Sequence, residues 1–478
     1  MTLETKAMTL SSPYAPLKFL NRQFAALRLL LSDPSIACMP QWVSFQNTVA
    51  CNLRCPHCQI HGMKKEYDKG LYTMPFELLK AAAEEALPAA DFFTLSLIGE
   101  PLASPHLETT LDELGRYGAA LDLITNGTLF TANRLALLIP ITRKIQISVD
   151  ATTEKIYEAI RLGANFRKVM NNIRLLTRTI ELLPEDTRPQ VSLSCTIMGS
   201  TIKDLPNIVR LAHLLGISEV SCCLVTVFYE HLKNEAVELY KPLYNAYFEE
   251  AQHVAQQLDI TLILPPLFEG VEADIRAPLA TTNMIVEQPP EEYYRKTPSV
   301  ISYLDFNAIE KEAVEVSATI SSEASHPKEF SLGKVIRAKQ KQLQKQLHTL
   351  VAENLEVLTG LYTLPDQPVK YCEYLERCVY ISSQGDVVPC CIPDRPVLGN
   401  INQSSITEVY NGSAYTAFRH EFYSNARDSF CSRCKFIRYI PRKVFLAQVF
   451  KSVPSHSAIA SIPGTAAPGL SDLVVYSY

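Results

Sequence analysis

Residues 48–60 have the sequence TVACNLRCPHCQI, which places three cysteines within eight positions in the order C-x3-C-x2-C. The preceding run QWVSFQNT is rich in β-branched and aromatic residues and predicts a strand. Closely spaced thiolates are typical ligands of zinc or of an iron–sulfur cluster. A closed zinc site needs a fourth ligand, for which His61 is better placed than His57, the neighbour of Cys58. A four-iron cluster held by three thiolates instead leaves one iron open to a small molecule.

Around this segment, strands and helices alternate along the chain. Six runs are predicted as buried strands: QWVSFQNT, FFTLSLIG, ALDLITNG, KIQISVD, VSLSCTIM and EVSCCLV. The helical periodicity between them predicts parallel strands with right-handed crossovers. Residues 41–264 therefore fit an incomplete (β/α) barrel or an open doubly wound sheet, with the ligand site at the carboxyl ends of the strands.

The composition is that of a globular protein rather than a small disulfide scaffold. The 478 residues are 47% hydrophobic with a formal net charge of −5, and this length predicts two or three structural units. The negative charge argues against a nucleic-acid partner. No secretory signal is visible in residues 1–20, and no apolar run reaches the roughly 18 residues of a membrane span. The 13 cysteines are expected to be free thiols in a reducing cytoplasm.

Outside the alternating region, residues 17–31 have the apolar spacing of an amphipathic helix, with Lys18, Arg22 and Arg28 interspersed. We expect this helix to pack on the main domain; the alternative is a helix on a membrane surface. Residues 265–334 show no sustained period, whereas residues 335–358 predict a helix with its leucines on one face. The predicted segments are 1–40 (extension with the amphipathic helix), 41–264 (core), 265–334 (insertion or linker), 335–440 (second cysteine-rich domain) and 441–478 (flexible tail).

Six further cysteines lie in the second domain. Cys431-x2-Cys434 has a spacing typical of metal ligands. The run VYISSQGDVVPC predicts a hairpin that turns at residues 384–386 and brings its two ends together.

The first domain resembles the radical S-adenosylmethionine (radical SAM) family. Its C-x3-C-x2-C segment follows the first strand of a βα unit. LSLIGEPLAS resembles the family's G-G-E-P turn, with Ile98 in place of the first glycine. LITNGTLF and ISVDATTEKIYEAIRLGANFRKVMNNI resemble the ends of the third and fourth strands, so the likeness spans about residues 41–230.

This resemblance implies a (β/α)6 TIM-like barrel in which Cys51, Cys55 and Cys58 hold a [4Fe–4S] cluster and SAM chelates the fourth iron. An alternative for Asp150 is a helix cap, and for Arg161 a surface position. The implied SAM contacts are Gly99, Glu100 and Pro101 at the amino group, with Glu100 also a candidate for a structural role, then Asn126 at the third strand end, Ser148 and Asp150 near the ribose or methionine, Arg161 at the carboxylate, and the backbone of His57 near the adenine.

The second domain resembles the SPASM/twitch auxiliary-cluster domain, an α+β unit, through its G-D-V-x-P-C-C hairpin, its L-G-N-I segment and its closing C-x2-C. The block C-x2-C-x5-C-x3-C of the full SPASM pattern is absent, so one auxiliary [4Fe–4S] cluster is expected. The resemblance assigns its ligands to Cys372, Cys390, Cys431 and Cys434. Cys378 is the main competitor, Cys391 is expected to face away, and zinc on the same four thiolates is the alternative. Cys38, Cys195, Cys222 and Cys223 are expected to be ordinary buried thiols.

The resemblance implies reductive cleavage of SAM to a 5′-deoxyadenosyl radical that takes hydrogen from a substrate. We first expect a small metabolite, such as a sugar, aminocyclitol or nucleoside. The alternatives are a ribosomally made peptide as substrate, or a non-catalytic iron–sulfur electron carrier. A flavodoxin or ferredoxin is the expected reductant.

Overall fold

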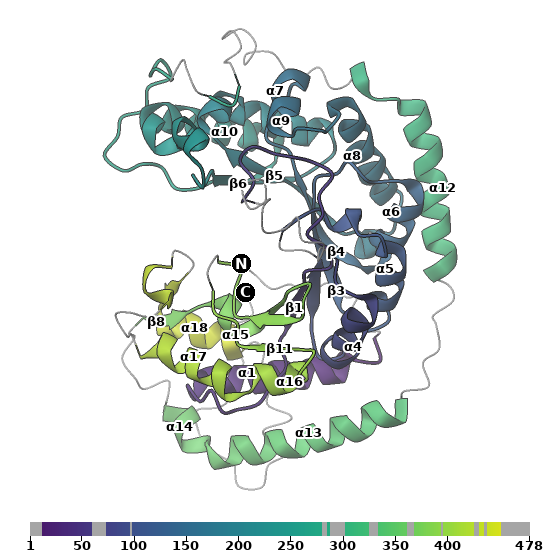
Figure 1. The fold of residues 1–478 in the computed structure, drawn as a ribbon, viewed down its shortest axis with the longest axis vertical. Helices are drawn as coiled ribbons and strands as arrows, with labels where there is room; N and C mark the ends of the chain where they lie inside the picture. The colour runs from purple at the N-terminus through teal and green to yellow at the C-terminus, as the bar shows by residue number, and fades with distance from the viewer. Residues whose placement is uncertain are drawn as a thin grey trace.

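The computed structural model describes residues 12–59, 73–95, 98–279, 284–286, 302–324, 333–360, 368–392, 395–424, 430–434 and 437–450. One sheet of ten strands forms its centre, in the order β11-β10-β9-β1-β2-β3-β4-β5-β6-β7 (Figure 1). Strands β1 to β7 each pair in parallel with the next. Their bounds are β1 Trp42–Phe45, β2 Phe92–Leu95, β3 Ala120–Thr125, β4 Thr142–Ser148, β5 Gln190–Ile197, β6 Glu219–Leu224 and β7 Thr261–Ile263.

The expected α/β fold with a mostly parallel, barrel-like sheet is confirmed, but the strand count is corrected. The sequence predicted six strands in the core, and β7 adds a seventh. This strand has only three residues, two of them exposed, so its run ITLI carries little of the signal of a buried strand.

Helices cover the outer face of the sheet, and the inner face is turned toward the opening of a C-shaped molecule (Figure 1). The helices that connect or support the strands are α1 Ala15–Leu30, α4 Phe76–Ala86, α5 Leu107–Gly115, α6 Ala132–Leu138, α7 Glu154–Ile160, α8 Phe166–Glu181, α9 Leu205–Leu214 and α10 Lys241–Leu258.

The central strands are buried on one face only, which corrects the expectation of fully buried strands. Along β4, the side chains of Ile145 and Ile147 are buried, whereas Gln146 and Ser148 are half-buried. Because successive side chains in a strand point to opposite faces, the apolar set packs under the helices and the polar set lies on the inner face. The inner face of this barrel is therefore polar.

The C-terminal domain joins the same sheet. Strand β9 (Cys378–Ile381) pairs in parallel with β1, and β10 (Asp386–Val388) returns antiparallel to β9. The turn between them contains Gly385 with φ +86°, a left-handed conformation that favours glycine, and the predicted hairpin is thus present. The other elements of the domain are β8 Val369–Tyr371, α15 Glu373–Arg377, β11 Gly399–Asn400, α16 Ile406–Tyr410, α17 Ser413–Tyr423, β12 Arg438–Ile440 and α18 Arg442–Phe450.

Helix α1 packs on the protein through its cations as well as its apolar side chains. The Lys18 ammonium donates to the carbonyl oxygens of Ala90 and, at 3.1 Å, Leu87. Arg22 pairs with Asp91 at 3.0 Å, and Arg28 is buried against the C-terminal domain. These contacts engage all three charges inside the fold, so the packed helix is correct and the membrane-surface alternative is wrong.

The segment 265–334 is not only a linker. Helix α12 (Phe306–Ala324) packs against α8 and α6 on the outside of the barrel. Its buried residues Ile309, Ala313, Val316 and Ile320 follow helical spacing. The surrounding serines and threonines obscured that stripe in the sequence. The predicted helix after it is present as α13 (Gly333–Glu353), which packs on α1 and is followed by α14 (Leu355–Gly360).

Across the described part of the chain, no helix combines the length and the apolar character needed to cross a membrane.

The buried ammonium of Lys18 makes a pH-dependent contribution to stability. Burial lowers the pKa of Lys18 to about 7. Between that value and its unfolded pKa of about 10.4, the unfolded chain holds a proton that the folded chain releases, so stability rises with pH in this window. We compare the thermal midpoints of the cluster-loaded wild type and of Lys18→Met. The stability of the wild type relative to the variant should rise between pH 7 and pH 9, by on the order of 2 kcal/mol in the free energy of unfolding.

The exposed Lys155 of α7 provides a matched control. The difference between wild type and Lys155→Met should not change with pH. An equally flat difference for Lys18→Met would contradict the low pKa.

Candidate active site

The three cysteines of the first segment lie on the loop after β1, at the carboxyl end of the parallel strands. A turn joins two of them, because the Cys58 N–H donates to the Cys55 carbonyl at 3.1 Å. The Leu53 N–H points at the Cys51 sulfur at 3.4 Å. Cys51 is exposed, Cys58 is half-buried and Cys55 is buried. The three thiols of the loop thus differ in their exposure to solvent.

The Gly99-Glu100-Pro101 turn after β2 packs against the backbone at the start of the cysteine loop. Gly99 has φ +89°, and a Cβ at this position would lie 2.8 Å from the Ala50 carbonyl oxygen, so only glycine fits. The Glu100 N–H donates to the same oxygen at 2.8 Å. The position before the turn tolerates Ile98, whose N–H donates to the Gln46 side chain at 3.2 Å.

Glu100 is fully engaged by the protein. One of its carboxylate oxygens accepts from the Thr125 hydroxyl at 2.7 Å and the Leu102 N–H at 3.2 Å, and the other accepts from the Asn126 N–H at 2.8 Å. Its side chain is only 2% exposed. These contacts support the structural role considered for Glu100: it joins the ends of β2 and β3.

Asn126 reaches the cysteine loop through a residue that sequence analysis missed. Its side-chain amide donates to the Asn52 oxygen at 3.0 Å, and both side chains contact the Thr128 hydroxyl. Asn52 lies between Cys51 and Cys55, and this position was the one feature of the sequence that could have pointed to its role. The link holds the cysteine loop against the end of β3.

Asp150 and Arg161 form a buried ion pair beside Cys55. The Arg161 Nε donates to Asp150 at 2.6 Å, and its Nη1 lies 4.0 Å from the Cys55 sulfur. The second Asp150 oxygen accepts from the Thr196 N–H at 2.9 Å. Although burial favours the neutral acid, the Arg161 charge holds the pKa of Asp150 below its ordinary value. Asp150 is thus buried and does not cap a helix; its contacts indicate that it holds Arg161 in position. Arg161 is not a surface residue.

The imidazole of His57 points into the same cluster rather than away from it. Its Nε2 lies 3.7 Å from Asp150. Burial lowers the pKa of His57, so the neutral ring is favoured. The resemblance implied that His57 contributes mainly backbone contacts.

The residues of this site fit a thiolate-bound cluster together with a polar ligand. Burial raises the pKa of Cys55 to about 11, so that thiol stays protonated until a metal displaces the proton. Two buried polar atoms beside the loop, His57 Nδ1 and the Tyr157 hydroxyl, have no hydrogen-bond partner in the structure. Ser148 lies at the end of β4 on the inner face, and Pro101 starts a short helical turn behind Glu100.

The loop after β6 also contacts the cysteine loop. His231 Nε2 lies 2.9 Å from the Pro56 carbonyl oxygen, and the ring of Tyr229 stacks on that of His231. The Tyr229 hydroxyl donates to the carbonyl of Gln59. Sequence analysis did not identify either aromatic residue, since no motif marks them. They contact the cysteine loop through the backbone carbonyls on either side of Cys58.

In the C-terminal domain, four cysteines lie within electrostatic reach of one another. Cys372, Cys390 and Cys434 all act on the thiol of Cys431, after burial, to raise its pKa to about 12. The Cys434 N–H donates to the Cys431 carbonyl at 3.0 Å, closing the C-x2-C turn. These are the four thiols that the sequence assigned to an auxiliary cluster.

The two competing cysteines pack together in an apolar group, although Cys391 also lies within electrostatic reach of Cys390 and Cys434. Cys378 is fully buried, and Cys391 packs with it against Tyr380 and Val388. Among the described residues, no group of three or more His, Cys, Asp or Glu side chains is arranged around a single metal ion.

The inner face of the sheet continues from this site as an accessible surface. Ile124 of β3 is 53% exposed and Ile263 of β7 is 50% exposed, although both lie in the sheet. Between them lie Ser194, Ser221 and Cys223, and the thiol of Cys223 is exposed. The expectation that Cys223 is an ordinary buried thiol is therefore wrong, whereas Cys38, Cys195 and Cys222 are buried as expected. Because successive side chains of a strand point to opposite faces, Cys222 is buried while its neighbour Cys223 is exposed.

Comparison with known families identifies both domains. Residues 47–212 match the radical SAM superfamily, and residues 372–435 match an iron–sulfur cluster-binding domain, SPASM. The first match implies SAM and a SAM-binding [4Fe–4S] cluster, and the second implies auxiliary iron–sulfur clusters.

Individual relatives are distant. The subtilosin biosynthesis protein AlbA of Bacillus subtilis (strain 168), described as antilisterial bacteriocin biosynthesis, is 27% identical over 142 residues, or 29% of this chain and 31% of that protein. The match thus spans about a third of the relative's length. Streptococcus suis SuiB bound to SAM is 11% identical with a TM-score of 0.48, covering 83% of this chain and 71% of that one. SuiB bound to the precursor peptide SuiA gives 10% and 0.45, covering 80% and 67%.

The Asp150–Arg161 pair should control the affinity for SAM. In Asp150→Asn, the amide oxygen can still accept from Thr196, but Arg161 loses its charge partner beside Cys55. We expect on the order of a ten- to hundredfold loss of SAM affinity, as for other groups that orient ligands around a metal site. Calorimetric titration of the cluster-loaded protein measures this loss, with iron content checked in parallel. Asp186→Asn, an exposed substitution, is the control; equal affinities for wild type and Asp150→Asn would contradict the assignment.

Cys223 should be the accessible thiol of the barrel interior. Partial burial on the sheet raises the pKa of the Cys223 thiol, and a hydrogen bond with the Thr196 hydroxyl lowers it by less. Alkylation by iodoacetamide should therefore be slow at pH 7 and accelerate as the pH rises past 9, because only the thiolate reacts. Peptide mapping of the cluster-loaded protein should find the label on Cys223 and not on Cys222. Equal labelling of both would contradict the strand alternation.

Proposed function

The chain is a member of the radical SAM superfamily with a C-terminal SPASM domain, and from this premise we propose that it modifies a peptide by radical SAM chemistry. The accessible polar inner face that runs from β3 to β7 beside the cysteine loop carries the proposal. A pocket for a small metabolite would bury the side chains at its centre. Here Ile124, on the central strand β3, and Ile263, on the edge strand β7, are both about half exposed.

The proposed division of labour starts with the thiolates of Cys51, Cys55 and Cys58, which hold the SAM-binding cluster. Such a cluster, with SAM bound, would supply the radical chemistry that removes a hydrogen atom from the substrate. Arg161, held by Asp150, provides a fixed positive charge toward a carboxylate at this site. Glu100 and Asn126 keep the loops in register, so that the cofactor meets a preorganised site.

The dimensions of the inner face suit an extended segment. Five neighbouring strands at about 4.8 Å spacing cover roughly 19 Å, the length of about six extended residues. Ile124 and Ile263 offer apolar contacts at the two sides, and the hydroxyl groups of Ser194 and Ser221 between them suit backbone amides.

The bacteriocin biosynthesis role of the relative AlbA supports a peptide over the small metabolite that we placed first from the sequence alone. We retain the sugar-like, aminocyclitol or nucleoside substrate as the second candidate. The third, an electron carrier without SAM cleavage, has no structural observation in its favour.

The same proposal assigns one auxiliary [4Fe–4S] cluster to Cys372, Cys390, Cys431 and Cys434. Such a cluster would take up the electron that is released when a substrate radical is oxidised, and the hairpin that leads to Cys390 is joined to the barrel sheet through the pairing of β9 with β1. A flavodoxin- or ferredoxin-type protein is the proposed reductant.

The activity is tested with reconstituted protein, dithionite and SAM under anaerobic conditions, by chromatography of 5′-deoxyadenosine. We expect 5′-deoxyadenosine from the wild type and none from Cys55→Ala, which lacks one ligand of the SAM-binding cluster. A control variant, Cys38→Ala, removes a buried thiol that belongs to neither cysteine group and should keep the activity.

The substrate class is tested by adding a library of precursor-like peptides or a panel of sugars, aminocyclitols and nucleosides. We expect peptides to raise 5′-deoxyadenosine formation at least tenfold and to change in mass. Stimulation by a small metabolite alone would overturn the peptide proposal, and loaded protein inactive with every substrate would favour the electron carrier.

A further inference from the structure

The loop after β6 contacts the second half of the cysteine loop, and we propose that its residues Tyr229 and His231 are positioning residues for the SAM-binding cluster. They fix the backbone on both sides of Cys58, the third ligand, and so keep its thiolate in place for the cluster. This role rests on the proposed function, in which Cys51, Cys55 and Cys58 hold that cluster.

The first half of the cysteine loop is held by the segments that follow β3 and β4. The Asn126 side chain, at the end of β3, donates to the Asn52 side chain at 3.0 Å. The Arg54 N–H donates to the carbonyl oxygen of Leu162, just after α7, at 2.9 Å. These contacts hold residues 52–54, before the turn that joins the second and third cysteines.

The second half of the loop is held by two side chains that follow β6. The Tyr229 hydroxyl donates to the Gln59 carbonyl, and His231 Nε2 lies 2.9 Å from the Pro56 carbonyl oxygen. Because a carbonyl oxygen only accepts, Nε2 carries the proton and the imidazole is the donor. The two rings stack with their centroids 5.6 Å apart and their planes 7° from parallel. This pair, the Tyr229–His231 clamp, therefore fixes both carbonyls.

The segment that carries the clamp is itself anchored in the fold. His231 belongs to the short helix η6 (Glu230–Glu235), whose last side chain, Glu235, is fully buried. The Glu235 carboxylate accepts from the Ser200 N–H at 2.8 Å and from the Ile285 N–H at 2.5 Å. A residue that positions another group must be held by its own surroundings, and these contacts supply that support.

Cys58 needs the clamp because the cluster requires all three sulfurs at once. A cluster with an open iron is held by only three thiolates, so displacement of one weakens both the cluster and the ligand at that iron. Within the loop, the Cys58 N–H donates to the Cys55 carbonyl at 3.1 Å and closes one side of the turn. The clamp holds the carbonyls two residues before and one residue after Cys58, and so closes the other side.

The clamp also fixes the backbone of His57, which follows Pro56 directly. The Nε2 of His57 lies 3.7 Å from Asp150, the partner of Arg161. A shift of the backbone between the two clamped carbonyls would therefore move a cluster ligand and the group beside this ion pair together. Loss of the clamp should consequently weaken the binding of SAM as well as the hold on iron.

Binding and redox measurements on the full-length, cluster-loaded protein test this role. Only the SAM-binding cluster should change its EPR signal when SAM is added, so this signal reports on that cluster in the presence of the auxiliary one. The double variant Tyr229→Phe/His231→Phe removes both donors and keeps two aromatic rings. We expect its SAM affinity to fall at least tenfold and the midpoint potential of the SAM-responsive signal to shift, with an unchanged thermal midpoint.

Two further variants separate the hydrogen bond from general effects of substitution. His231→Gln retains an N–H donor at the position of Nε2 and should restore most of the SAM affinity that His231→Phe loses. His213→Phe, an exposed substitution on α9, should behave as the wild type. The role is overturned by equal SAM affinity and potential in the wild type and the double variant, or by equal losses in His231→Gln and His231→Phe.

Failure of the proposed function gives a different result. A wild type whose EPR signal does not respond to SAM contradicts the radical SAM chemistry and not the clamp. The rate at which an iron chelator removes iron from the wild type and from the double variant then decides. Faster loss from the double variant supports the clamp, and equal rates overturn it.

Discussion

Strand β1 is paired in parallel on both of its edges, with β2 on one side and β9 on the other, and the rest of the molecule depends on this double pairing. Val43 is in register with both Phe93 and Val379, and all three side chains are fully buried. Because both edges of β1 are satisfied by backbone hydrogen bonds, the barrel and the C-terminal hairpin form one sheet. The first cysteine loop follows the carboxyl end of β1, whereas Cys378 of β9 is in register with Trp42 at the other end of that strand.

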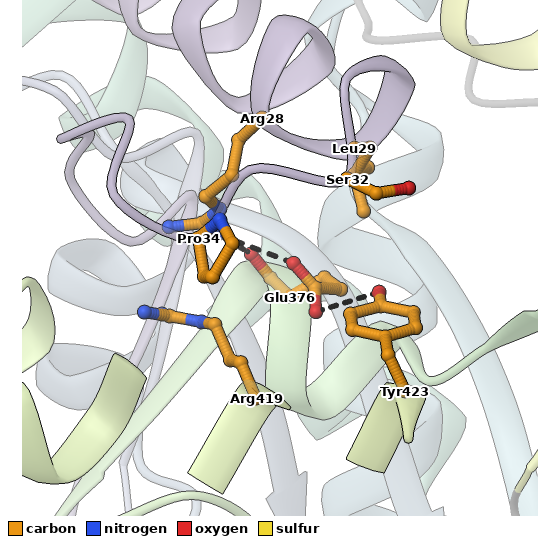
Figure 2. A pocket seen from close by; sticks show the side chains of 7 residues that line it. All are labelled: Arg28, Leu29, Ser32, Pro34, Glu376, Arg419 and Tyr423. Carbon is orange, nitrogen blue, oxygen red and sulfur yellow. Dashed lines mark hydrogen bonds and ion pairs between the residues drawn. The ribbon is translucent and has the colours of Figure 1, made fainter. Parts of the chain in front are cut away.

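The two buried charge clusters show different solutions to the same electrostatic problem. Asp150 is balanced by Arg161 and accepts a backbone N–H, so its buried charge is satisfied by fixed partners near the cysteine loop. Arg28 pairs with Glu376 at 3.5 Å (Figure 2), whereas the guanidinium of Arg419 stacks on the rings of Tyr410 and Tyr415, and both arginines keep unpartnered N–H groups. The first cluster, with its charges paired, preorganises a site for a ligand.

The polar inner face connects the fold to the proposed chemistry. Barrels with a packed interior fill it with branched apolar side chains. Here Gln146, Ser148, Ser194 and Ser221 occupy corresponding positions and are half-buried rather than packed. The side chains on this face of the sheet are therefore partly accessible, which suits the proposed contact with a substrate.

The sequence by itself determined the alternation of strands and helices, both cysteine groups and the turns at Gly99 and Gly385, because these depend on local periodicity and on the conformational freedom of single residues. It did not reveal β7, which is too short to show a period, or the stripe of α12 among serines and threonines. Only the tertiary structure decided the roles of Glu100, Asp150 and Arg28. Their partners are far apart in the chain, and whether a carboxylate or a guanidinium meets a ligand or the protein depends on the groups that folding brings around it.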